Sequence, residues 1–214
     1  DGQYVVNPQY DAAGAFSEGR AAVKLKRRWG YIDKSSTVII PSQFETAGEF
    51  SEGLAAIELG DRWGFIDLSG KIVINPQFDK AEAFSCSLAA IKMNRRWGFI
   101  DKNGKIVINP QFEEVRPFVK GVAPVRIGSR WGFVDIAGKI VVNPQFDGAD
   151  AFAEDLASVK LAGRWGFVDK NGKYVINPQF DEAASFNEGL ARVKVSRKTG
   201  YVDENGRYVW NPTN

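Results

Sequence analysis

The stretch Arg62-Trp63-Gly64-Phe65-Ile66-Asp67 decides the fold, because it recurs along the whole chain. Its copies follow one another every 34 residues, without insertion or deletion. A fixed period of this length is typical of a repeat architecture, in which each unit buries its apolar face against its neighbour. The sequence therefore predicts six equivalent units, in place of the one or two ordinary domains that 214 residues would suggest.

The period also sets the expected unit boundaries. We expect a single repeat domain over residues 1–214, and its first residue, Asp1, falls inside a repeat, which predicts a processed or excised piece of a longer protein. The residues before the first unit form an extra copy of the third strand of the repeat. The predicted units run from about 10–43, 44–77, 78–111, 112–145, 146–179 and 180–214, and the extra strand covers 1–9.

The residue pattern within the unit 44–77 indicates strands. Apolar runs at 54–59, 62–67 and 71–74 are rich in Val, Ile and aromatic residues and are bounded by Gly, Pro, Asn and Asp. A weaker fourth strand is expected at 44–50. We expect the third strand to stop at Asn75-Pro76-Gln77, since proline lacks the N–H that a ladder requires.

Short turns join these strands, so the unit is expected to be an antiparallel meander. The predicted fold class is all-β, a tandem array of six 34-residue repeats. A six-bladed β-propeller of small antiparallel sheets is favoured, because repeats without insertions can be equivalent around an axis. An open β-solenoid or superhelical stack is the alternative, since the third strand occurs seven times, whereas the strand that carries the Trp, or Thr199 in its last copy, occurs six times.

The recurring Trp, Gly and Asp residues are interpreted as a structural frame. A large ring beside a glycine can pack one sheet on the next, although exposed rings could also stack on sugars or bases. The Asp heads a tight turn, where its carboxylate can accept bonds from backbone N–H groups, and the further carboxylates of a calcium loop are missing. The predicted frame residues are Trp29, Gly30, Asp33, Trp63, Gly64, Asp67, Trp97, Gly98, Asp101, Trp131, Gly132, Asp135, Trp165, Gly166, Asp169, Gly200 and Asp203.

Two charged columns allow both a structural and a functional interpretation. The cation before each Trp could pair with a neighbouring unit's Asp or lie on an aromatic ring, and it could also bind an anionic ligand. The carboxylates at Glu18, Glu52, Glu154 and Glu188 precede a strand, and Cys86 takes their place in one unit. Because each carboxylate has the same surroundings, none has the asymmetric partner that glycoside hydrolysis requires.

Composition excludes several classes of function. The chain has no histidine and one cysteine, which excludes His-based catalysis and an internal disulfide. The 28 basic and 26 acidic residues give a net charge of +2, which argues against nucleic acid as a partner. No apolar run approaches 18 residues, so no membrane insertion is expected.

The motif Lys/Arg-Trp-Gly-Phe/Tyr-Ile/Val-Asp-x-x-Gly-Lys, followed by Val-Ile-x-Pro-Gln-Phe and Ala-x-x-Phe-x-Glu-Gly-Leu-Ala, resembles the bacterial WG-repeat family over essentially the whole chain. The chain departs from the motif at Thr199, which replaces Trp, and at Ile40-Pro41-Ser42-Gln43, where the proline is shifted. The resemblance implies an interaction module, found beside many other domains, often in envelope or secreted proteins. The family motif contains no catalytic residue.

The sequence therefore predicts a non-catalytic binding scaffold for protein partners. A carbohydrate or cell-wall binding module is the alternative, and an enzyme that uses the Asp or Glu columns is the reading least supported. No catalytic residue, metal site or cofactor is predicted. A specific surface is expected where the repeats differ, and residues 113–124, with two extra prolines, diverge most.

Overall fold

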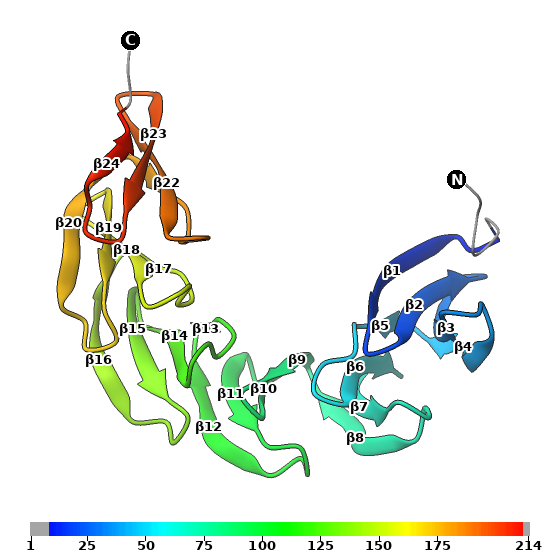
Figure 1. Cartoon of the computed structure of the whole chain (residues 1–214). Helices are drawn as coiled ribbons and strands as arrows, with labels where there is room; N and C mark the ends of the chain where they lie inside the picture. Colours follow the sequence, from blue (N-terminus) through cyan, green and yellow to red (C-terminus); the bar gives the residue numbers. More distant parts are fainter. Residues whose placement is uncertain (1–8, 212–214) are drawn as a thin grey trace, which may run out of the picture. The chain divides into compact units, whose positions relative to one another are not determined.

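The computed structural model describes residues 9–211, which form strands and turns arranged in six four-stranded sheets (Figure 1). The strands of each sheet follow one another in sequence order, and neighbouring strands such as β6 and β7 or β14 and β15 pair antiparallel. The predicted all-β array of six meander repeats is confirmed. Most of the predicted extra strand at 1–9 lies outside the described residues. No helix among residues 9–211 has the length and apolar character that a membrane crossing needs.

The chain divides into two compact units, residues 1–110 and 111–214. The first unit holds three sheets, and its last strand ends just past the division between Pro110 and Gln111. Its strands are β1 (Ala12–Ser17), β2 (Arg20–Leu25), β3 (Arg28–Asp33), β4 (Val38–Phe44), β5 (Thr46–Ala47), β6 (Leu54–Leu59), β7 (Arg62–Asp67), β8 (Ile72–Phe78), β9 (Lys80–Ser85), β10 (Leu88–Met93), β11 (Arg96–Ile100) and β12 (Ile106–Phe112).

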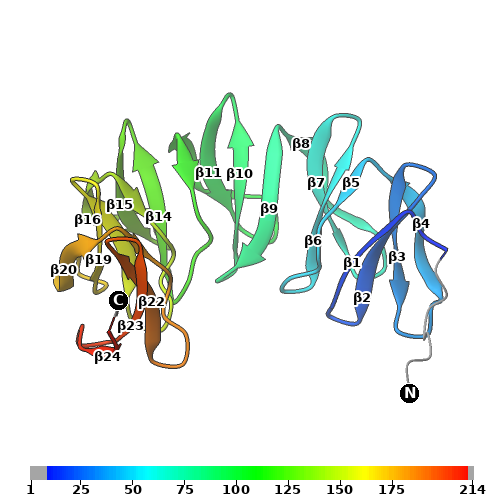
Figure 2. The same cartoon turned by 90° about the horizontal axis from the view of Figure 1, so that it is seen from above.

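The second unit holds the other three sheets and has the same strand order (Figure 2). Its strands are β13 (Glu114–Val115), β14 (Val122–Ile127), β15 (Arg130–Asp135), β16 (Ile140–Phe146), β17 (Gly148–Ala149), β18 (Ala157–Leu161), β19 (Arg164–Val168), β20 (Tyr174–Phe180), β21 (Glu182–Ala183), β22 (Leu190–Val195), β23 (Lys198–Asp203) and β24 (Tyr208–Trp210). The first strand of a sheet is the weak one, and it shrinks to two residues in β5, β13, β17 and β21.

The core lies between successive sheets of each unit. In the second sheet Ala55 and Ile57 face the first sheet, and Ala56 and Phe65 face the third. The Phe65 ring meets the Phe84 ring of the third sheet edge to face, with centroids 4.9 Å apart. Burying one such ring contributes about 1.5–3 kcal/mol, so each sheet is stabilised chiefly by its neighbours.

The third strand of the repeat does not stop at Asn75-Pro76-Gln77, as the sequence suggested. The strand β8 continues to Phe78, because a bulge absorbs the proline. Trp63 pairs with Phe78 and Phe65 pairs with Ile74, so β8 has two residues more than β7 over this interval. A proline can sit within a bulge because its nitrogen is not needed for the ladder there.

The glycine after each Trp has a role that differs from the predicted one. A Cβ built on Gly64 would lie 2.5 Å from the Ile74 carbonyl oxygen and 2.7 Å from the Pro76 nitrogen. The glycine therefore makes room for the bulged strand of its own sheet. Gly30 has the same close neighbours in the first sheet, although the proline there is shifted to Pro41.

Candidate functional site

The cation before four of the Trp residues forms an ion pair with the carboxylate at the start of the next repeat. The Arg62 guanidinium meets Asp79, whose other carboxylate oxygen accepts a hydrogen bond from the Asn94 N–H at 2.9 Å. This is one of the two structural roles expected for the column. Because both side chains are exposed, each pair contributes at most about 1 kcal/mol. The other pairs of this kind are Arg28–Glu45, Arg130–Asp147 and Arg164–Asp181.

The Asp column organises the turn before the third strand. Asp67 Oδ1 accepts hydrogen bonds from the Ser69 N–H at 2.9 Å and the Lys71 N–H at 3.0 Å, and the Gly70 N–H donates to the Asp67 carbonyl at 2.9 Å. Gly70 has a φ of 88°, which glycine adopts without strain. The Ser69 hydroxyl bond, and then the backbone bonds, lower the pKa of Asp67 against an opposing effect of burial.

The Glu column links the turns of neighbouring repeats. The Glu18 carboxylate accepts a hydrogen bond from the Gly53 N–H at 2.9 Å, and Glu154 accepts one from the Gly189 N–H at 3.1 Å. Glu52 accepts from the Ser87 N–H and pairs with the Lys102 ammonium at 3.1 Å. Burial raises the pKa of Glu52, but these partners lower it by more. These carboxylates thus act between repeats, and each serves a different turn.

Cations cover four of the five Trp rings in the repeat motif, and of these five only Trp131 is fully buried. Lys24, Lys92 and Lys160 belong to the second strand of their sheets, opposite the Trp, and their ammonium groups lie 5.5–5.8 Å from the ring centroids. Such a cation is attracted by the negative face of the ring. The rings covered in this way are Trp29, Trp97 and Trp165.

In the second unit a different residue covers Trp131. The Arg116 guanidinium lies 5.4 Å from the ring centroid of Trp131. Its Nε donates to the Ala149 carbonyl oxygen at 3.1 Å and lies 3.4 Å from Asp150 Oδ1. The guanidinium thus lies over the ring and meets a carbonyl and a carboxylate of the next sheet. Trp131 is 6% exposed, which places it in the core.

A groove in the first unit opens beside the remaining ring, Trp63. Its volume is about 500 Å³, and it lies between the second and third sheets, where β9 packs on β6 and β7. The residue opposite Trp63 is Glu58, which accepts a hydrogen bond from the Thr46 hydroxyl at 2.6 Å. No Lys or Arg of residues 9–211 covers the Trp63 ring. The groove walls include Gly48, Glu49, Trp63, Lys80, Ala81 and Glu82.

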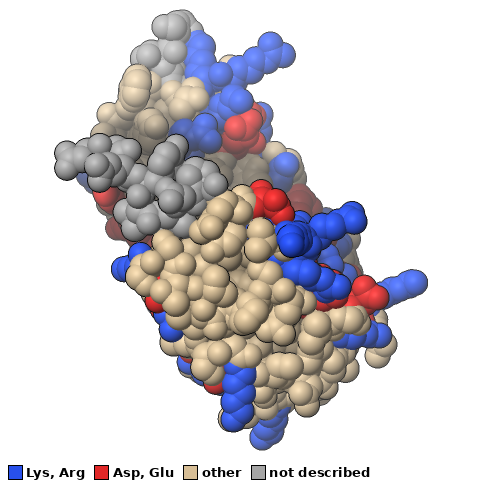
Figure 3. All heavy atoms as spheres, turned by 90° about the vertical axis from the view of Figure 1, so that its right-hand side faces the viewer, with Lys and Arg blue, Asp and Glu red and all other residues tan. Residues whose placement is uncertain are grey.

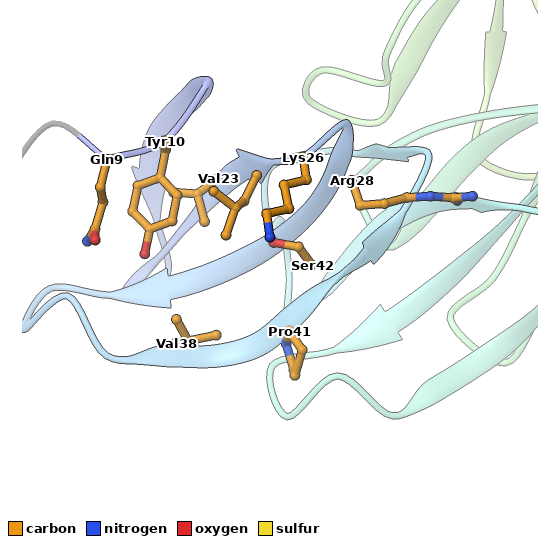
Figure 4. A pocket seen from close by; sticks show the side chains of 9 residues that line it. Gln9, Tyr10, Val23, Lys26, Arg28, Val38, Pro41 and Ser42 are labelled. Atoms are coloured by element: carbon orange, nitrogen blue, oxygen red, sulfur yellow. The ribbon is translucent and has the colours of Figure 1, made fainter.

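A second hollow of about 500 Å³ lies on the first sheet. Figure 4 shows Tyr10, Val23 and Val38 on one side of it and Lys26 and Arg28 on another. The hollow begins at Gln9, the first residue that the structure describes. Figure 3 shows Lys and Arg side chains gathered along one edge of a face that is otherwise mostly uncharged. Because the groove at Trp63 lies wholly among described residues, we take that groove as the candidate site.

The repeat signature is decisive for classification. The family model described as WG containing repeat matches residues 1–27, 29–63, 63–97, 97–131, 131–165 and 165–198. The chain belongs to the WG-containing repeat family. No curated protein matches this chain in sequence.

Solved structures share the fold of these WG repeats. A eukaryotic initiation factor aligns over 97% of this chain and 67% of its own, with 12% identity and a TM-score of 0.63. Hsv2 of Kluyveromyces lactis aligns over 92% of this chain and 78% of its own, with 12% identity and a TM-score of 0.55. Both are propeller-like, and at these identities the likeness concerns the fold alone.

Of the predicted frame residues, the structure brings Trp63 to the groove, whereas Asp67 lies in the turn between β7 and β8. Sequence reasoning missed the groove itself. The available signal was the coincidence of two residues in one unit, an acidic residue in an otherwise basic column and a glycine at a variable position. Glu58 stands where other units have Lys or Arg, and Gly48 stands where the fourth unit has Arg116.

Proposed function

We propose that the chain is a non-catalytic scaffold that binds protein partners. The observation that carries this proposal is that the constant charged positions of the repeat hold the fold together, whereas another position varies from unit to unit. The Asp and Glu columns and the Arg pairs described above are engaged within the frame. In contrast, one position in or just after the first strand differs in nearly every unit, and two of its copies, Gly48 and Glu82, line the groove at Trp63. It is filled by Gly14, Gly48, Glu82, Arg116, Asp150 and Ala184.

The chemistry of the described residues supports a scaffold over an enzyme. Residues 9–211 hold no group of three or more Cys, Asp or Glu that could bind a metal ion. The carboxylates with a shifted pKa, such as Asp67 and Glu52, shift downward, which keeps them ionised. A general acid requires the opposite shift. The frame residues named from the sequence are therefore proposed to serve structure only.

A carbohydrate-binding function is the second candidate, and one observation favours it. Tyr201 and Trp210 stack on the outer face of the sixth sheet, with centroids 6.1 Å apart and ring planes 15° apart. Trp210 is 63% exposed, so this pair offers an aromatic surface on which a sugar ring could stack.

The two functions are separated by direct binding measurements. We expect the immobilised chain to retain a defined polypeptide from cells that express it, and the purified polypeptide to bind with a saturable, fixed stoichiometry in calorimetry. A glycan array should give no signal that depends on Trp210, as judged with Trp210→Ala. Signals lost in that variant, without any saturable polypeptide, would favour the carbohydrate module instead.

A further inference from the structure

The chain contains both a filled and an open version of one binding arrangement. In the second unit, Arg116 lies over Trp131 and reaches Ala149 and Asp150 of the next sheet. In the first unit, the equivalent positions of the repeat are Gly48, Trp63, Ala81 and Glu82, and these residues line the groove. The ring, the carbonyl position and the carboxylate are thus present in the first unit, and only the guanidinium is missing.

The backbone hydrogen bonds are equivalent at Arg116 and at Gly48. The Arg116 N–H donates to the Pro124 carbonyl at 3.0 Å, and the Gly48 N–H donates to the Ala56 carbonyl at 2.9 Å. Pro124 and Ala56 occupy the same position of the repeat. The first strand therefore has the same register at both places. The difference lies in the side chains, so the groove at Gly48 corresponds to the space that the Arg116 side chain fills.

The charges around the groove select a cation. Glu49 and Glu82 line it, and Glu58 is the cross-strand neighbour of Trp63, whereas Lys80 adds one positive charge. Neither the Glu49 nor the Glu82 carboxylate has a hydrogen bond or an ion pair within residues 9–211. In the filled version, by comparison, Asp150 is held by the Ser158 hydroxyl at 3.0 Å as well as by Arg116.

We propose that the groove over Trp63 binds an arginine side chain of a protein partner, in the manner in which Arg116 is bound over Trp131. Arginine fits better than lysine, because its planar guanidinium stacks on an aromatic ring while its N–H groups donate to a carboxylate and a carbonyl. This inference rests on the proposed function, since it names the chemical group through which the scaffold takes a protein.

The first test uses N-acetyl-L-arginine amide as the probe, and the indole N–H signal of Trp63 in a ¹⁵N NMR spectrum as the readout. Trp63→Phe assigns that signal among the six tryptophans. One guanidinium over a half-buried ring in an open groove binds weakly, so we expect saturation with a dissociation constant on the order of 10 mM. The matched probe N-acetyl-L-citrulline amide has nearly the same shape without the charge, and it should shift the signal at least about tenfold less at equal concentration. Equal shifts with both probes would overturn the proposal.

The second test fills the groove from within. A Cβ on Gly48 would lie 3.4 Å from the nearest backbone oxygen, which is an ordinary contact, so Gly48→Arg is compatible with the fold. We expect Gly48→Arg to abolish the response of Trp63 to the probe, and Gly48→Ala to preserve it. If Gly48→Arg folds with an unchanged melting temperature and still responds as the wild type does, the arginine site is not there.

The reverse substitution should create a second site. Removing the side chain in Arg116→Gly opens the space over Trp131, so the Trp131 indole should begin to respond to N-acetyl-L-arginine amide.

Lys80→Ala should strengthen binding of the same probe at Trp63, because it removes a positive charge that repels the guanidinium. Weaker binding of this cationic probe in Lys80→Ala would mean that the charges around the groove do not select a cation, which would also overturn the proposal.

Binding of a protein partner to these variants distinguishes the proposed arginine site from the proposed scaffold function. A protein that binds the wild-type chain and Gly48→Ala, and loses at least about tenfold in affinity for Gly48→Arg, supports both proposals. A protein that binds Gly48→Arg as tightly as the wild type supports the scaffold and removes the groove as its docking site. If the probe titration at Trp63 succeeds and no protein binds, the arginine site stands and the scaffold falls.

Discussion

Gly64 and Pro76 belong to adjacent strands of one sheet, and their backbones approach so closely that a Cβ on Gly64 would lie 2.7 Å from the Pro76 nitrogen. The contact exists because β8 bulges opposite β7, with two extra residues between its pairs with Trp63 and Phe65. The glycine of the repeat motif is therefore a steric requirement of the bulge. In the first sheet Ser42 takes the place of Pro76 and the same approach is kept, so the glycine is needed more strictly than the proline.

Gly64→Ala should destabilise the first unit strongly. The new methyl group would meet backbone atoms of β8, which cannot rotate away as a side chain could, and we expect a loss of about 2–4 kcal/mol in the free energy of unfolding. Gly14→Ala is the matched control, since a Cβ there would lie 3.8 Å from its nearest neighbours. Its effect should stay within about 0.5 kcal/mol in urea denaturation. A loss of similar size in both variants would refute the steric explanation.

The sequence predicted the fold more completely than the groove, for physical reasons. The strands expected at 54–59 and 62–67 coincide with β6 and β7, because their apolar pattern and the flanking glycines are local signals. The bulge at Pro76 was missed, since two extra residues on one strand leave no mark on that strand's own pattern. The groove was missed because it depends on Gly48 and Glu58 together, across two strands, and on a comparison with Arg116 in another unit.

Tyr31→Phe should reveal a hydrogen bond between the first two sheets. The Tyr31 hydroxyl donates to the Gly48 carbonyl at 2.7 Å, and the equivalent positions of the next four units hold phenylalanine, so the variant should fold. We expect a loss of about 0.5–1.5 kcal/mol at pH 7. Burial raises the pKa of Tyr31 above its ordinary value of 10.0. The folded state then keeps a proton that the unfolded state releases, and stability falls as the pH rises above about 10.

Tyr31→Phe removes this alkaline loss, which amounts to about 1.4 kcal/mol per pH unit for one group. The difference in urea midpoint between wild type and variant should therefore shrink between pH 9 and pH 11, as measured by tryptophan fluorescence. A difference that stays constant over this range would show that Tyr31 ionises as readily in the folded chain as in the unfolded one.

Ser69→Ala should raise the pKa of Asp67 towards its ordinary value. The Ser69 hydroxyl donates to Asp67 Oδ1 at 2.6 Å and is the largest cause of the lowered pKa, while burial opposes it. Ala137 occupies the same turn position in the fourth unit, so the variant keeps a turn that the chain already uses. A carboxyl ¹³C titration of both proteins measures the shift, and an unchanged Asp67 pKa would mean that the backbone bonds alone set it.

The sign of the acid dependence follows from the same shift. The folded state keeps Asp67 ionised at a pH where the unfolded chain already binds a proton. The contribution of Asp67 to the free energy of unfolding is therefore present above about pH 3.8, and it is lost as the pH falls through the lower pKa of the folded state. Asp67→Ala removes the acceptor and should cost about 1 kcal/mol at pH 7. That cost should shrink below pH 3.8 in thermal denaturation. A cost that grows on acidification would contradict the sign.

Trp165 and Thr199 occupy the same motif position in the fifth and sixth units, and exchanging the two residue types should change the free energy of unfolding unequally. Trp165 packs on a core cluster that includes Phe186 and Val193 of the sixth sheet, with Lys160 over its ring, so Trp165→Thr should cost about 2 kcal/mol. Thr199 is the exposed counterpart in the sixth sheet. Thr199→Trp should change the free energy of unfolding by less than about 0.5 kcal/mol, because a ring there gains area from its own sheet only. Chemical denaturation of both variants measures the asymmetry. If Thr199→Trp instead stabilises the chain by as much as Trp165→Thr destabilises it, the outer face of the sixth sheet is covered in solution.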